Sequence, residues 1–165
     1  MEYTLGTPVR DSIFDRDTTY YICHMTFQNA LSVACAIIEK NGLFLAARRG
    51  RSQLHAGFWE FPGGKIGSHE SAESAIVREI REELGGTVVI IRRLNHVTFA
   101  YPDKTVTLIP FVCDGSAASF RASEHEEIRW VDGTNPETLA WLPPDAEILA
   151  SYQCSREIKR MASRP

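Results

Sequence analysis

The sequence predicts an α/β or α+β protein in which a mixed β-sheet is sandwiched between helices, an α/β/α arrangement. Short apolar segments with strand character come first, followed by one amphipathic helix, more strand candidates and a final helix, an order typical of layered folds. The chain has 165 residues, of which 44% are hydrophobic, enough to bury one core. No break in composition demands a second domain.

The first predicted elements form a β-hairpin. Leu31–Glu39 is rich in valine, isoleucine and small residues, which is typical of a buried strand. Asn41 and Gly42 mark a tight turn, and Leu43–Arg48 fits the returning strand. We expect Arg49–Gly67 to form a loop, because glycines recur through it.

The segment before this hairpin has no clear hydrophobic period. We interpret residues 1–29 as an N-terminal extension, in which Thr18–Met25 is a candidate edge strand. The organised domain is expected to comprise residues 30–165.

The clearest predicted element is a helix over Ser71–Leu84. Ser71 is a suitable N-cap, Glu73 favours the first turn, and Gly85 with Gly86 ends the helix. The elements expected after it are four strands and a final helix with proline near its start: Thr87–Arg92, His96–Tyr101, Thr105–Cys113, Glu127–Val131 and the helix Pro144–Met161.

Charge and composition exclude several classes of protein. The net charge of −3 provides no basic field for long nucleic acid. No stretch approaches the length of a membrane span, and the N-terminus lacks the pattern of a signal peptide. The four scattered cysteines are expected to be reduced thiols. We therefore expect a cytoplasmic protein, a monomer or homodimer, that binds a small molecule.

Three glutamates crowd one side of the predicted helix. On a helical wheel Glu83 lies inside the apolar stripe and Glu79 at its edge, and together with Glu82 they span an arc of about 100°. Carboxylates near a packed surface lose hydration and repel one another, and a hard divalent cation such as Mg²⁺ offsets both effects. The alternative is a solvated acidic face, with Arg78 and Arg81 as ion-pair partners.

The residues upstream of the helix add a second signal. Gly63 and Gly64 allow a ligand to approach the backbone closely. Positive charges gather around the same loop at Lys65, Arg48, Arg49 and Arg51. Together with the acidic helix, this pattern indicates a site for a metal-bound polyphosphate. Ordinary surface charge is the alternative reading of the arginines.

These residues resemble a known family. The pattern Gly64-x5-Glu70-x7-Arg78-Glu79-Ile80-x-Glu82-Glu83-x-Gly85 matches the Nudix box. The chain departs from it at Gly86, where an aliphatic residue is usual, and we expect only a local effect at the helix end. Similarity to the MutT-like branch extends over about Leu31–Tyr152, and its strongest segments are Phe58–Lys65, Tyr101–Lys104 and Trp141–Asp145.

The resemblance implies a Nudix fold and a catalytic Mg²⁺, with Mn²⁺ as a possible substitute. The implied metal ligands are Glu79, Glu82, Glu83 and the carbonyl of Gly63, with Arg78 and Glu70 orienting them.

A further glutamate from a later loop is also implied, as a metal ligand or general base. Glu124 is the best match, and Glu126 and Glu127 compete with it. Either Glu79 or Glu124 would take the proton from the attacking water.

The same resemblance suggests how the substrate is bound. Phe61 and Tyr101 are candidates for stacking on a nucleobase, and core packing is the alternative for both rings. Arg49 matches a nucleotide-contacting position, and Lys104 is a weaker parallel. Asp145 occupies a base-reading position, where an ionised carboxylate suits an exocyclic amine such as cytosine N4 and a protonated one can donate. The alternative is that Asp145 caps the final helix.

The predicted function is a magnesium-dependent hydrolase that splits a nucleoside triphosphate into monophosphate and pyrophosphate. An 8-oxo-dGTP-like substrate is favoured, which implies sanitising of the nucleotide pool. The alternatives are CTP or a modified dCTP, another diphosphate such as a sugar nucleotide, and a nucleotide sensor that does not catalyse.

Overall fold

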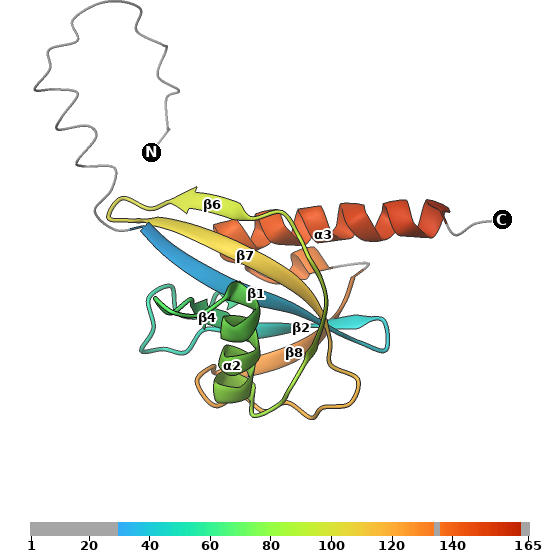
Figure 1. The fold of residues 1–165 in the computed structure, drawn as a ribbon, viewed down its shortest axis with the longest axis horizontal. Coiled ribbons are helices and arrows are strands. Elements are labelled where there is room, and N and C mark those ends of the chain that lie inside the picture. The colour runs from blue at the N-terminus through green and yellow to red at the C-terminus, as the bar shows by residue number, and fades with distance from the viewer. Residues whose placement is uncertain (1–29, 134–135, 163–165) are drawn as a thin grey trace, which may run out of the picture.

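The computed structural model describes residues 30–133 and 136–162. Within them, eight strands form one mixed sheet and two α-helices lie against it (Figure 1). The candidate edge strand Thr18–Met25 lies outside the described residues. No helix of this part of the chain is long and apolar enough to cross a membrane.

The sheet is organised around two long strands that run parallel. The central strand β1 (Ala30–Lys40) pairs in parallel with β7 (Thr105–Asp114) from Ala30 to Glu39. The other pairings between strands of the sheet are antiparallel. The remaining strands are β2 (Leu43–Arg48), β3 (Trp59–Glu60), β4 (Gly63–Lys65), β5 (Val89–Arg93), β6 (Val97–Ala100) and β8 (Glu127–Asp132).

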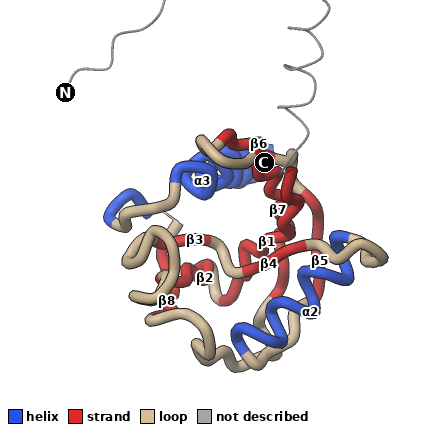
Figure 2. The backbone as a smooth tube through the Cα atoms, turned by 90° about the vertical axis from the view of Figure 1, so that its left-hand side faces the viewer, coloured by secondary structure: helices blue, strands red, loops and turns tan. Residues whose placement is uncertain are grey.

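Side chains of β1 alternate between two cores on opposite faces of the sheet, as the pleat requires. Cys35 and Ile37 pack on the side of α3 (Pro143–Ala162), whereas Ala34, Ala36 and Ile38 pack on the side of α2 (Ala72–Leu84). Figure 2 shows the two helices on opposite sides of the sheet. The predicted mixed sheet between helices is confirmed.

Local signals account for the bounds of α2. The Ser71 hydroxyl accepts a hydrogen bond of 3.1 Å from the backbone N–H of Ser74, which satisfies one of the amides exposed at the helix start. Gly85 ends the helix with φ of 66°, a left-handed conformation that favours glycine.

The prediction of an uninterrupted loop over residues 49–67 is wrong, because β3 and β4 lie within it. Strands of two or three residues carry no readable period. β4 forms because Gly63 lacks a side chain: a Cβ there would lie 2.1 Å from the carbonyl oxygen of Ala34 on β1. Backbone approach, and not side-chain pattern, creates this strand.

The unusual glycine at the end of the Nudix-like pattern has a packing partner. A Cβ on Gly86 would lie 2.5 Å from the ring of Phe120, which also packs over Gly115 and has Trp130 at a ring-centroid distance of 6.1 Å. Phe120 thus fills the volume that an aliphatic side chain at residue 86 would occupy.

We predict that Gly86→Val lowers the free energy of unfolding by about 1–3 kcal/mol, because it overpacks this contact. Urea unfolding measures the change. The double variant Gly86→Val/Phe120→Leu should recover part of the loss, and Thr87→Val at the exposed neighbour is the control. Full stability of Gly86→Val would contradict the packing argument.

Candidate active site

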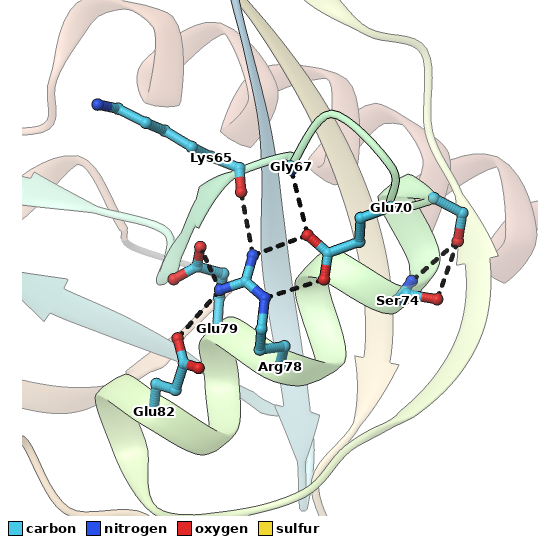
Figure 3. Close-up of polar contacts among 8 residues, drawn as sticks. Lys65, Gly67, Glu70, Ser74, Arg78, Glu79 and Glu82 are labelled. Carbon is cyan, nitrogen blue, oxygen red and sulfur yellow. Dashed lines mark hydrogen bonds and ion pairs between the residues drawn. The ribbon is translucent and has the colours of Figure 1, made fainter.

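Arg78 is the centre of an ion-pair network on α2 (Figure 3). Its guanidinium donates two hydrogen bonds of 2.9 Å to the carboxylate of Glu70, a bidentate pair. It also lies 2.8 Å from Glu79 and 3.0 Å from Glu82, and donates to the carbonyl of Lys65 at 3.1 Å. The pKa of Arg78 is raised, chiefly by Glu70 and then by Glu79. This arginine therefore holds the glutamates and the preceding loop in one arrangement.

Glu70 closes that loop onto the helix. Its carboxylate accepts the N–H of Gly67 at 3.2 Å in addition to the two bonds from Arg78. The Arg78 hydrogen bonds lower the pKa of Glu70. The two residues predicted to orient the site therefore contact each other directly.

Two glutamates of α2 lie against the two-glycine segment at Gly63 and Gly64. A Cβ on Gly64 would lie 2.3 Å from the Glu79 carboxyl carbon. The buried Glu83 accepts the N–H of Gly63 at 3.0 Å. Burial raises the pKa of Glu83 to about 7, the charge of His125 and the Gly63 N–H oppose the rise, and Glu60 and Glu79 add to it. The prediction that Glu83 lies on the packed side of the helix is confirmed.

The donor chemistry of this helix face fits a hard divalent cation. Glu79 and Glu83 lie one turn apart and provide oxygen donors, and burial, which raises the pKa of Glu83, disfavours its charged form unless a cation lies beside it. Glu82 is more open, with its side chain 54% exposed. Among the described residues, no group of three or more acidic, histidine or cysteine side chains is arranged to hold a metal ion. Magnesium does not require one, since it uses few carboxylates and keeps water or phosphate ligands.

The loop before β8 brings Glu124 toward the end of α2. The neighbouring Ser123 donates its N–H at 3.0 Å to the carbonyl of Glu83, and its hydroxyl bonds that carbonyl and that of Glu82. Glu124 itself is exposed. The competitors have arginine partners instead: Glu126 lies 3.7 Å from Arg51, and Glu127 pairs with Arg129 at 2.6 Å and Arg48 at 3.7 Å.

A pocket of about 420 Å³ adjoins the two-glycine segment, on the side away from the α2 glutamates. This size suits a small organic ligand. Its lining includes most of the residues predicted to bind substrate: Arg49, Lys65, Tyr101, Lys104 and Asp145. The backbone at Gly63 thus contacts both the acidic helix and the pocket.

The expectation that Phe61 stacks on a base is not supported by its position. The residue is 3% exposed, and its ring packs 5.0 Å from Trp141 and 5.8 Å from Phe44 in the core. Tyr101 instead lies at the pocket, with the ring of His55 at 6.0 Å and the Lys104 ammonium at 5.8 Å.

Asp145 is a buried acid at the wall of the pocket. It lies in the first turn of α3 and is 2% exposed, and its Oδ1 accepts the N–H of Phe61 at 2.8 Å. Burial raises the pKa of Asp145 to about 8, although the Phe61 N–H and the charge of Arg49 oppose the rise. A neutral carboxyl can donate a hydrogen bond, which an ionised carboxylate cannot.

Glu60, which the sequence did not single out, lines the same pocket from β3. One carboxylate oxygen lies 2.5 Å from Arg49 and the other 3.1 Å from the buried imidazole of His125. A charged residue between Trp59 and Phe61, both of them buried, was the available signal. His125 carried no such signal, because histidines occur commonly as packing residues.

Comparison with known proteins identifies the family. The family model described as NUDIX domain matches residues 33–151. This chain belongs to the NUDIX domain family. The chain is 38% identical over 90 residues to the 8-oxo-dGTP diphosphatase of Proteus vulgaris, covering 53% of this chain and 80% of that protein. It is 30% identical over 135 residues to the CTP pyrophosphohydrolase of Escherichia coli K12, covering 82% and 96%.

Solved structures agree with this Nudix assignment. The solution structure of the E. coli ORF135 protein matches with a TM-score of 0.68 and 29% identity, over 78% of this chain and 91% of that one. The crystal structure of a MutT protein from Methanosarcina mazei Go1 matches with a TM-score of 0.66 and 30% identity, over 79% and 97%. The resemblance drawn from the Nudix box is therefore confirmed.

The protonation of Asp145 gives this Nudix domain a testable pH dependence. The folded protein keeps a proton up to about pH 8 that the unfolded chain releases near pH 4, so this residue's contribution to stability is lost as the pH rises between these values. Asp145→Asn preserves an oxygen to accept the Phe61 N–H but carries no charge. We predict that its melting temperature, relative to wild type, increases from pH 5 to pH 9. Parallel curves would contradict a neutral Asp145.

Proposed function

We propose that this Nudix domain is a magnesium-dependent nucleoside triphosphate pyrophosphohydrolase that removes oxidised guanine nucleotides of the 8-oxo-dGTP type. The observation that carries the proposal is the two-glycine segment, which has the acidic face of α2 on one side and the nucleotide-sized pocket on the other. A triphosphate lying across this segment would place its base in the pocket and its phosphates beside the glutamates.

The proposed metal ligands are Glu79, Glu82, Glu83, the carbonyl of Gly63 and Glu124. When bound, Mg²⁺ or Mn²⁺ supplies charge that offsets the phosphate oxygens and increases the acidity of a water molecule. Removal of the metal by a chelator is expected to abolish turnover.

Other side chains of the protein are proposed to position the metal ligands, to accept a proton and to bind phosphate. Arg78 keeps Glu79 and Glu82 in place and is itself anchored by Glu70. Glu79 or Glu124 accepts a proton from the attacking water, which adds to a phosphorus in line with its leaving group. The bond between the α- and β-phosphates breaks, and the nucleoside monophosphate and pyrophosphate are released. Lys65 lines the pocket, and its proposed role is to neutralise phosphate charge.

Base selection would rest on two carboxyl groups in different protonation states. Neutral Asp145 donates a hydrogen bond, and Glu60, paired with Arg49, accepts one. The Hoogsteen edge of 8-oxoguanine offers the matching pattern, an O6 acceptor beside an N7–H donor. Unmodified guanine has a hydrogen-bond acceptor at N7, which the carboxylate of Glu60 would repel. Tyr101 is the proposed stacking surface for the base.

A cytidine triphosphate is the second candidate. Cytosine also offers an acceptor and a donor side by side, at N3 and N4, and the CTP pyrophosphohydrolase of E. coli aligns with 82% of this chain. Both substrates are free nucleotides, so we propose that the enzyme acts in the cytoplasm as a monomer or homodimer, without long nucleic acid or membrane.

We predict that Glu82→Gln lowers kcat at least about 100-fold while the melting temperature stays within a few degrees, because Glu82 is exposed and its charge serves the metal. Chromatography of monophosphate and pyrophosphate measures turnover of 8-oxo-dGTP, dGTP and CTP with Mg²⁺. Glu73→Gln, at an exposed acid of the same helix, is the matched control and should keep full activity.

The substrate panel separates the alternatives. Preference for 8-oxo-dGTP over dGTP and CTP supports the proposal, and preference for CTP replaces it with the cytidine activity. Wild-type protein that binds these nucleotides without cleaving them would be a sensor and would refute the catalytic proposal.

A further inference from the structure

We infer that His125 is a positioning residue that holds the Glu60–Arg49 pair in the wall of the nucleotide pocket and thereby determines how tightly the substrate binds. The inference rests on the proposed function, since it concerns the same pocket. Neither the Nudix-like pattern nor the charge pattern of the sequence assigns this histidine a role.

The imidazole immobilises the carboxylate of Glu60. The side chain of His125 is only 2% exposed, and its Nε2 lies 3.1 Å from Oε1 of Glu60. Arg49 occupies the other oxygen, Oε2, at 2.5 Å. A carboxylate paired with a guanidinium only accepts hydrogen bonds, so Nε2 carries the hydrogen. With a partner on each oxygen, Glu60 cannot rotate without breaking one of these contacts.

Arg49, the guanidinium partner of Glu60, also holds the loop between β2 and β3. Arg49 donates from Nε to the carbonyl of Leu54 at 2.7 Å, and its own carbonyl accepts the N–H of Gly57 at 3.0 Å. Leu54 and His55 line the pocket opposite Tyr101. Loss of the His125 contact would therefore loosen Glu60, then Arg49, then this wall of the pocket.

The backbone on both sides of His125 is fixed. Ser123 bonds the carbonyl of Glu83 at the end of α2, and the N–H of Glu126 bonds the carbonyl of Arg48 on β2 at 2.9 Å. An anchored segment thus holds the ring beside Glu60. A merely space-filling residue here would not need a polar ring.

The second ring nitrogen supports a role beyond stability. His125 Nδ1 is buried and has no hydrogen-bond partner among the described residues. A buried polar atom without a partner costs folding free energy, and most buried side-chain nitrogens avoid it. A residue selected for stability alone would be apolar, so the contact from Nε2 to Glu60 is the feature that favours histidine.

The test compares His125→Leu with His125→Gln in steady-state kinetics on 8-oxo-dGTP and CTP. Leucine removes the donor, and glutamine returns an N–H donor at similar reach. We expect His125→Leu to raise KM about tenfold with kcat within about threefold of wild type, the size of effect of one lost hydrogen bond to a charged group. His125→Gln should restore most of the affinity. His96→Leu, at an exposed histidine, is the control.

A double-variant cycle with Glu60→Gln identifies the path of the effect. If His125 acts through Glu60, adding His125→Leu to Glu60→Gln raises KM little beyond the value of Glu60→Gln alone. Additive effects on KM overturn the inference. So does a fall in kcat at unchanged KM, which would point to the neighbouring Glu124, or an equal loss in the leucine and glutamine variants.

Calorimetric binding of 8-oxo-dGMP and CMP separates this inference from the proposed function. If wild type binds a monophosphate without cleaving any triphosphate, the proposed activity fails, and tenfold weaker binding by His125→Leu still supports the role of His125. Equal binding by both proteins overturns the inference while leaving turnover by wild type intact. Wild type that neither binds nor cleaves overturns both.

Discussion

The absence of side chains at Gly63 and Gly64 is the constraint on which the rest of the structure depends. Because Gly63 has no Cβ, its strand can pair with β1, where a methyl group would collide with the backbone at Ala34. Because Gly64 has none, the carboxylate of Glu79 can lie against the chain. One dipeptide thus joins the central strand, the acidic helix and the pocket, and a side chain at either position would separate them.

The glutamates of α2 are only partly paired with positive charge. Arg78 compensates the glutamates on the outer side of α2, but Glu83 lies on the inner side, where burial and its acidic neighbours raise its pKa to about 7. Folding provides the free energy that holds these like charges together, since Ile76 and Ile80 of the same helix are fully buried. A bound cation would relieve the remaining repulsion, which links the fold to the proposed chemistry.

Burial also determines the protonation of an acid in the pocket. Asp145 is buried deeply enough for its pKa to rise to about 8, whereas Glu60 has a guanidinium and an imidazole as partners. Two acids that line the same pocket therefore offer opposite hydrogen-bonding character, one donating and one accepting. This contrast arises from environment and not from residue type.

The sequence by itself determined the layered fold, α2 with its caps, the crowding of its glutamates and the Nudix family, because these features depend on periodicity and on local spacing along one helix. It did not reveal β3 and β4, whose two or three residues carry no period, or the contact of Gly86 with Phe120 from a distant loop. Only the tertiary structure placed Phe61 in the core, joined His125 to Glu60 and buried Asp145. Those outcomes depend on burial and on partners far apart in the chain, and no local pattern encodes which neighbours a side chain will meet.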